Sequence, residues 1–265
     1  MSTNNFDIIT GIHSVACALQ NSERKNKTLY VTDESLKALE KELNTRIQNL
    51  SGDSPEDEIE VQVLSTHSLQ DRAKNICQSE GFQYSRFPSN LFLVTTKMEA
   101  KDLNWLYDKI VSNEVTKIIA LDKVTDAHNG AAIMRTAAFY GVDAIIVASR
   151  GGFGETPSFF RISSGASEFV PIVKASSLPK VIGKLKDMGV YCLGLSEHAT
   201  KEVKDLDLEK KPFKCLVMGA EDTGLGNAVS RQVDDIIALE SMGPIKSLNV
   251  SVASAIAMER VFSQK

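Results

Sequence analysis

The second half of the chain alternates short apolar segments with longer amphipathic ones. Apolar runs such as Ala144-Ile145-Ile146-Val147 are typical of strands buried on both faces of a parallel sheet. We expect strands at residues 117–121, 143–148, 169–173, 190–195, 214–218 and 235–239. Helices are expected at residues 129–140, 157–166, 177–188 and 247–263, with a short turn after Gly224. This order predicts an α/β fold with a parallel sheet and helices on both faces.

The first hundred residues mix the two kinds of segment less regularly. We expect helices at 11–20, 33–50 and 66–78, the second of them capped by Asp33, and strands at 28–31, 60–64 and 91–96. The acidic residues 51–60 are expected to form a solvated loop, and residues 100–112 a helical connector. A chain of 265 residues exceeds the usual size of one domain. We therefore expect a small α/β domain with its connector at 1–105 and a larger domain at 106–265.

The last expected helix is apolar on more than one side. Leu248 and Val252 repeat on one face and Val250 and Ala253 on another, and the first charge comes at Glu259. A helix that is apolar nearly all round is expected to be covered all round. The protein's own sheet can cover one face, and a second copy of the chain is the simplest cover for the other. The pattern therefore predicts a homodimer.

A polar cluster of Ser247, Asn249 and Ser251 opens this helix. We expect Ser247 to cap it, which leaves amide N–H groups and the positive end of the helix dipole facing a cleft. The combination predicts a ligand site at a subunit interface.

Composition narrows the class of protein. No apolar run reaches membrane-spanning length, and the first residues lack the basic and apolar parts of a signal peptide, so a soluble cytoplasmic protein without membrane contact is expected. Four scattered cysteines and four scattered histidines predict free thiols and no metal site. The net charge of −4 lies wholly in residues 1–100, which hold 10 basic and 14 acidic residues. An RNA substrate would therefore have to meet local basic clusters.

Three polar segments follow strands of the larger domain, where ligands bind in parallel sheets. They are residues 121–141, 216–226 and 244–255, and each turns through Gly, Asn or Ser before a helix. In this order the segments resemble the motifs of the SpoU (TrmH-like) RNA ribose 2′-O-methyltransferases of the SPOUT superfamily. The resemblance covers roughly residues 115–262. Near the start, Gly11, His13, Val15, Ala18 and Leu19 are similar to the small RNA-binding domain that often precedes it.

The resemblance implies a fold and a reaction. The fold is a parallel sheet closed by a C-terminal trefoil knot, which periodicity cannot predict. The protein would be a homodimer that binds S-adenosyl-L-methionine in the knot and transfers its methyl group to a ribose 2′-hydroxyl of structured RNA, either tRNA or rRNA. Residues 1–105 would then be a small α/β RNA-binding domain.

The resemblance also implies which residues form the site. The catalytic candidates are Arg135, Glu221, Asn129, Ser247 and Asn249. The candidates for cofactor binding are Gly219, Leu239, Leu248, Leu216, Gly224 and Asn249. The glycines would let the backbone approach the cofactor without a Cβ in the way.

The role of each catalytic candidate has alternatives. By resemblance Arg135 helps to deprotonate the hydroxyl, but a guanidinium with a pKa above about 12 is a poor base and is better suited to pair with phosphate or stabilise an alkoxide. Glu221 would face the hydroxyl or the cofactor's cation, or only cap a turn. Asn129, Ser247 and Asn249 are substrate contacts or helix caps.

The chain departs from the family pattern at Asn129-Gly130-Ala131-Ala132, where the usual order is Asn-x-Gly-Ala. Two other functions stay open: an RNA-binding protein of the same fold without catalysis, and a methyltransferase for another nucleophile, such as a base nitrogen. The glycine-rich segment that begins at Arg150 lacks the Gly-Lys-Ser/Thr of a nucleotide-binding loop. We expect it to be a flexible loop over the substrate, with Arg150 and Arg161 near RNA phosphates.

Overall fold

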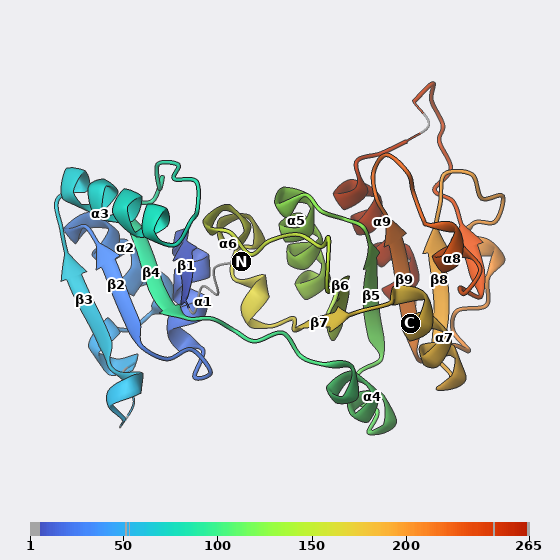
Figure 1. Cartoon of the computed structure of the whole chain (residues 1–265), viewed down its shortest axis with the longest axis horizontal. Helices are drawn as coiled ribbons and strands as arrows, with labels where there is room; N and C mark the ends of the chain where they lie inside the picture. The colour runs from blue at the N-terminus through green and yellow to red at the C-terminus, as the bar shows by residue number, and fades with distance from the viewer. Residues whose placement is uncertain (1–5, 51, 53, 246, 264–265) are drawn as a thin grey trace. The chain divides into compact units, whose positions relative to one another are not determined.

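The computed structural model describes residues 6–50, 52, 54–245 and 247–263. Contacts divide the chain into two compact units, each of which is described by itself (Figure 1). The first consists of Met1–Glu99 and Glu155–Glu168, and the second of Ala100–Gly154 and Phe169–Lys265. The domain boundary expected after residue 105 stays a prediction, but residues 155–168 group with the first unit and not with their neighbours in sequence.

The first unit is built on a four-stranded mixed sheet. Its strands are β1 (Phe6–Thr10), β2 (Lys27–Val31), β3 (Ile59–Val63) and β4 (Leu91–Thr96), in the order β1-β4-β2-β3. Strand β4 runs antiparallel to both of its neighbours, and β2 pairs with β3 in parallel. Strand β1 was not predicted, because its buried Asp7 interrupts the apolar pattern.

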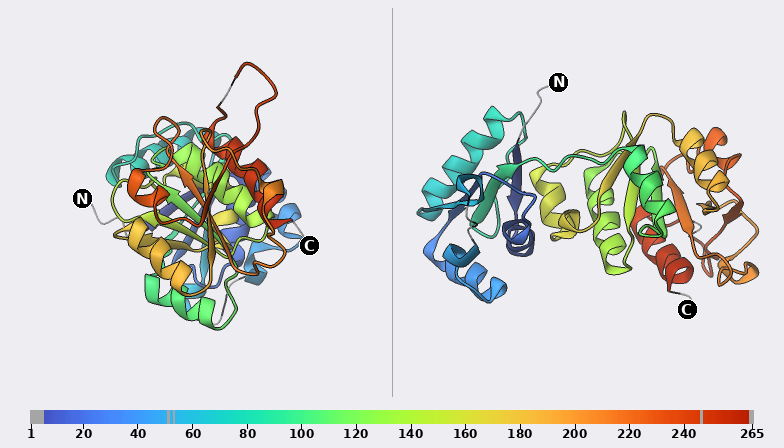
Figure 2. Two further views of the ribbon diagram at one scale, coloured as in Figure 1. Left: turned by 90° about the vertical axis from the view of Figure 1, so that its right-hand side faces the viewer. Right: turned by 90° about the horizontal axis from the view of Figure 1, so that it is seen from below.

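Helices cover both faces of this sheet (Figure 2). They are α1 (Ile12–Gln20), α2 (Asp33–Leu43), α3 (Thr66–Ser79) and α6 (Pro157–Ser163), with 3-10 turns η1 (Ile47–Leu50), η2 (Pro55–Asp57) and η3 (Ala166–Glu168). Leu69, Ala73 and Cys77 of α3 pack on Tyr30 and Phe92 of the sheet. Helices α1 and α2 pack against each other, and α6 packs on β1.

Two helix boundaries in this unit differ from the prediction. The helix expected at 33–50 ends at Leu43, because Asn44 is left-handed with φ 52°. Its cap is Thr32 and not Asp33, since the Thr32 side chain accepts a hydrogen bond from the Ser35 amide. The helix expected at 157–166 ends at Ser163, because Ser164 is left-handed with φ 53°.

The second unit contains a six-stranded sheet in which every pairing is parallel. Its strands are β5 (Lys117–Asp122), β6 (Ala144–Ala148), β7 (Ile172–Ala175), β8 (Tyr191–Leu195), β9 (Lys214–Gly219) and β10 (Asp235–Ile237), in the order β10-β8-β9-β5-β6-β7. The predicted strands all occur, but β7 begins three residues late, since Phe169 is exposed and Pro171 precedes the ladder.

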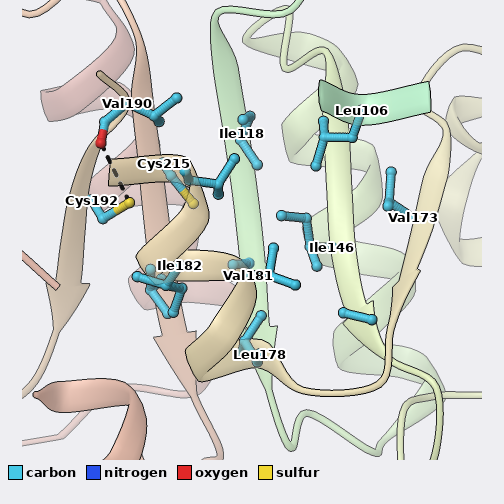
Figure 3. Packing of buried hydrophobic residues seen from close by; sticks show 14 of the residues in the cluster. Leu106, Ile118, Ile146, Val173, Leu178, Val181, Ile182, Val190, Cys192 and Cys215 are labelled. Atoms are coloured by element: carbon cyan, nitrogen blue, oxygen red, sulfur yellow. Dashed lines mark hydrogen bonds between the residues drawn. The ribbon is translucent and has the colours of Figure 1, made fainter. Parts of the chain in front are cut away.

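Helices lie on both faces of the second sheet as well (Figure 2). They are α4 (Leu103–Val111), α5 (Ala127–Phe139), α7 (Leu178–Asp187), α8 (Asn227–Ser230) and α9 (Val250–Phe262), with a 3-10 turn η4 (Val203–Asp205). Leu106 of α4 and Val181 of α7 pack over Ile118 and Ile146 (Figure 3). Helices α5 and α9 pack against each other on the opposite face. The predicted parallel sheet with helices on both faces is confirmed.

Within the described ranges, no helix is both long enough and apolar enough to cross a lipid bilayer.

Candidate functional site

A cavity of about 470 Å³ opens in the second unit beyond the carboxyl ends of β8, β9 and β10. Parallel sheets bind ligands at this edge, because their βα loops meet there. The loops after these three strands line the cavity together with the start of α9. The lining residues include Leu195, His198, Met218, Gly219, Glu221, Gly224, Leu239, Ser247, Leu248, Val250 and Ile256.

Gly219 ends β9 at the wall of this cavity. A Cβ atom built on it would lie 2.1 Å from the carbonyl carbon of Gly224, so no other residue fits there without moving the backbone. Gly224 has φ 61°, and its amide donates to the Ala220 carbonyl at 2.8 Å. Both glycines line the cavity, and together they make a tight turn that brings Glu221 to its rim.

Three of the expected catalytic residues meet in one hydrogen-bonded cluster. The Nδ2 of Asn129 donates to Oε2 of Glu221 at 3.2 Å. The Nδ2 of Asn249 donates to Oδ1 of Asn129 at 3.0 Å and to the same Glu221 oxygen at 3.4 Å. Each residue comes from a different one of the three polar segments, and Glu221 also lines the cavity. We call these residues the Asn-Glu-Asn cluster.

Two helix caps position the amides of this cluster. Asp126 caps α5 and accepts a hydrogen bond from the Asn129 amide at 2.8 Å, so the Asn129 side chain is not needed as a cap. Asn249 caps α9, and its Oδ1 accepts from the Ser251 amide at 2.9 Å while its Nδ2 bonds within the cluster. The expected cap at Ser247 is wrong, because α9 begins at Val250 and Asn249 takes the capping place.

The other expected residues lie at the cavity, in the core or on the surface. Ser247, Leu239 and Leu248 line the cavity, where Leu248 is half-exposed. Leu216 is fully buried in β9 and does not line it, and its expected contact with a cofactor stays a prediction. Arg135 is exposed on α5, six residues after Asn129, and does not line the cavity either. At about 100° per residue, Arg135 faces a different direction from Asn129.

Sequence analysis missed one buried side chain that braces the site. Asp122 ends β5 and is 7% exposed, and its Oδ2 accepts a hydrogen bond from the Gly226 amide at 2.8 Å. This bond ties the end of β5 to the loop that follows β9. The sequence feature that could have identified Asp122 is a carboxylate at the end of an apolar strand, where it can reach the amides of a neighbouring loop. Among the described residues, no three His, Cys, Asp or Glu side chains are arranged to hold a metal ion.

Comparisons with known proteins point to one family. A family model for the SpoU rRNA methylase family matches residues 116–259. The 23S rRNA (guanosine-2′-O-)-methyltransferase RlmB of Vibrio parahaemolyticus is 27% identical over 98% of this chain and 97% of its own length. The Burkholderia protein of the same name is 33% identical over 65% of this chain and 68% of its own.

Solved structures share the fold at lower identity. The SpoU methyltransferase AviRb from Streptomyces viridochromogenes, in complex with the cofactor AdoMet, has a TM-score of 0.72 and 20% identity, covering 98% of this chain and 90% of its own. A putative RNA methyltransferase of the TrmH family from Porphyromonas gingivalis has a TM-score of 0.66 with 20% identity over 98% of this chain and 90% of its own.

Proposed function

The chain belongs to the SpoU rRNA methylase family, and from this we infer that it transfers a methyl group from S-adenosylmethionine to a ribose 2′-hydroxyl of RNA. The observation that carries the proposal is the Asn-Glu-Asn cluster at the rim of the 470 Å³ cavity. Ribosomal RNA is the first candidate substrate, because the relatives aligned along nearly the whole chain are named as 23S rRNA methyltransferases.

The cavity suits S-adenosylmethionine in size and chemistry. Its volume of about 470 Å³ lies in the usual range for small-molecule sites. Leu195, Met218, Leu239 and Leu248 offer apolar walls for an adenine ring, and the bare backbone at Gly219 allows close approach. When bound, this cofactor would supply an electrophilic methyl group on a sulfonium centre.

The protein's own groups would orient the reactants and help the hydroxyl to lose its proton. Holding reacting atoms in line can supply roughly 7–11 kcal/mol. The Glu221 carboxylate is fixed by amide donors from two helices, so it would present a charged oxygen to the ribose hydroxyl or to the positive charge beside it. Gly219 and Leu239 would hold the cofactor in place.

Arg135 requires a separate account, since it lies outside the cavity of its own chain. We propose that it acts in the cavity of a second copy, where it pairs with the substrate phosphate or stabilises the developing alkoxide. Val252 supports this dimer, because this apolar residue in the first turn of α9 is 48% exposed in the single chain and does not line the cavity.

Two finer features belong to the same proposal. The return of the chain from edge strand β10 to α9, which packs on β9 and α5, supports a trefoil knot in the C-terminal segment. Residues 1–105 would be the domain that binds the RNA. Because this domain has a net negative charge, it would contact the RNA through local basic groups.

Methylation of RNA from cells that lack the protein tests the proposed function. The purified protein is incubated with that RNA and labelled S-adenosylmethionine, and the RNA is digested and analysed by mass spectrometry. We expect the label on a ribose, in a dinucleotide that resists alkaline hydrolysis because its 2′-oxygen is blocked. A label on a base would favour the base methyltransferase, and RNA binding without cofactor binding would favour the non-catalytic alternative.

A further inference from the structure

Gly130 lies inside α5, directly after Asn129 of the Asn-Glu-Asn cluster. A glycine within a helix costs about 1 kcal/mol relative to alanine, so its presence here needs a reason. The structure gives one, because the ring of Phe153 takes the place of a side chain. A Cβ atom built on Gly130 would lie 2.5 Å from both Cγ and Cδ1 of that ring. Alanine therefore cannot replace Gly130 unless the ring moves.

The segment that carries Phe153 is shaped to bring the ring there. Strand β6 ends at Ala148, and β6 lies next to β5, the strand that leads into α5. Gly151 has φ 75°, and a Cβ on Gly152 would lie 3.1 Å from the Ala148 carbonyl oxygen. Two successive glycines thus let the chain turn sharply after β6. Phe153 is half-buried where it meets Gly130.

We propose that Phe153 is a positioning residue that holds the first turn of α5 so that Asn129 keeps its place in the cluster; this rests on the proposed function. Two restraints then fix that turn. Asp126 holds the Asn129 amide from the helix end, and the Phe153 ring presses on the next residue from the side.

The Asn129 bonds to Glu221 and Asn249, at 3.2 and 3.0 Å, depend on this placement. Hydrogen bonds weaken steeply as their geometry is lost, and a misplacement of about 1 Å in a catalytic group can lower a rate about 100-fold. The glycine-rich segment therefore contributes to the site through packing, in addition to any contact with RNA.

A size-exchange experiment tests the proposal. Phe153→Ala removes the ring, Gly130→Ala pushes it away, and the double variant puts a methyl group where the ring was. We expect each single variant to lower kcat about 10- to 100-fold. Cofactor affinity should stay within about twofold, because no cavity-lining residue is changed. The double variant should have a kcat about tenfold higher than Gly130→Ala alone, since the new Cβ no longer meets the ring.

Two further comparisons separate positioning from general damage. In an Asn129→Ala background, Phe153→Ala should lower kcat less than about twofold, because the residue it acts through is gone. Gly183→Ala is the matched control, since this α7 glycine faces only the flexible amide end of Gln232, at 3.2 Å from a built Cβ. The proposal would be overturned if the losses in kcat of Gly130→Ala and Phe153→Ala added up in the double variant. It would also be overturned if Phe153→Ala lowered kcat as much in the Asn129→Ala background as in the wild type.

An NMR measurement decides the matter independently of activity. The side-chain NH₂ of Asn129 is bonded to Glu221, so its protons should exchange slowly with solvent. We expect faster exchange in both single variants and slower exchange again in the double variant. If no RNA is methylated and this pattern still holds, the proposed function fails while the positioning role stands. Unchanged exchange in Phe153→Ala would refute the positioning role even in an active enzyme.

Discussion

Glu221 carries the formal charge of the Asn-Glu-Asn cluster, and both of its amide partners donate to the same carboxylate oxygen, Oε2. Neither of these bonds uses its other oxygen, Oε1, and the residue itself lines the cavity. A carboxylate held in this way is oriented before substrate arrives, and preorganised charge contributes strongly to catalysis. The turn after Gly219 therefore contributes to the proposed reaction by positioning the Glu221 side chain.

We predict that Glu221→Gln lowers kcat about 100-fold. Glutamine keeps the shape and one acceptor oxygen for the two asparagines but removes the negative charge. Steady-state kinetics with labelled cofactor measures the change. Isothermal titration calorimetry separates the two roles, since cofactor binding is retained if Glu221 faces the ribose hydroxyl and weakened if it faces the positive charge of the cofactor. Glu209→Gln makes the same charge change at an exposed loop position and serves as the control. Wild-type turnover in Glu221→Gln would mean that the charge has no role in the reaction.

At the scale of elements, a buried ion cluster joins three segments of the first unit. Arg24 is 1% exposed and donates to Glu168 of η3 through Nε at 3.0 Å and Nη2 at 2.8 Å. Its Nη1 donates to Asp7 of β1 at 2.5 Å and to the Thr96 carbonyl of β4 at 2.9 Å. These bonds, together with the packing of α6 on β1, join residues 155–168 to the first unit.

We predict that Arg24→Met destabilises the protein by about 3–5 kcal/mol, because it removes the guanidinium that is hydrogen-bonded to two buried carboxylates. Burial already raises the pKa of Asp7, and the Arg24 charge opposes that rise. Without Arg24 the pKa of Asp7 in the folded state rises further above its value in the unfolded state. Deprotonation of Asp7 then destabilises the folded protein more strongly. The loss of stability should therefore be larger at pH 8 than at pH 5.

Urea unfolding followed by circular dichroism at the two pH values measures this difference. Arg46→Met is the control, since Arg46 is exposed in the same unit. An equal loss at both pH values would contradict the electrostatic explanation, and the lost packing of the Arg24 side chain would then account for the effect.

At the scale of the whole molecule, we propose that the reaction uses two chains, because Arg135 does not line the cavity of its own chain. Arg135 is exposed on α5, the helix that packs against α9. Residues at the start of α9 line the cavity. A second copy that covers this helix pair would bring a guanidinium from one chain to the cavity of the other.

We predict that two inactive variants complement each other in a mixed dimer. Arg135→Ala lacks the guanidinium, and Leu239→Arg fills the cavity of its own chain with a long charged side chain. If Arg135 acts across the dimer, the isolated heterodimer has one complete site and about half of the wild-type activity. Differently tagged, co-expressed chains allow its purification. An inactive heterodimer, or a wild-type protein that sediments as a monomer, would contradict the arrangement.

The sequence by itself determined the βα order of the second unit and the edge of the sheet where the polar segments gather. Both follow from local patterns, since the apolar period identifies strands and helices, and parallel strands end at one edge. Which side chain caps α9 was not decided locally, because Ser247 and Asn249 are both good caps and only the position of the helix start selects Asn249.

Only the tertiary structure decided the pairing of Arg24 with Glu168 and the placement of Phe153 on Gly130. It also left Arg135 exposed and outside the lining of the cavity of its own chain. These contacts join residues far apart in sequence, and no local period encodes which distant side chain fills a given space. The sequence alone does not explain why residue 130 is a glycine. The structure does, because the Phe153 ring occupies the space that a side chain would need.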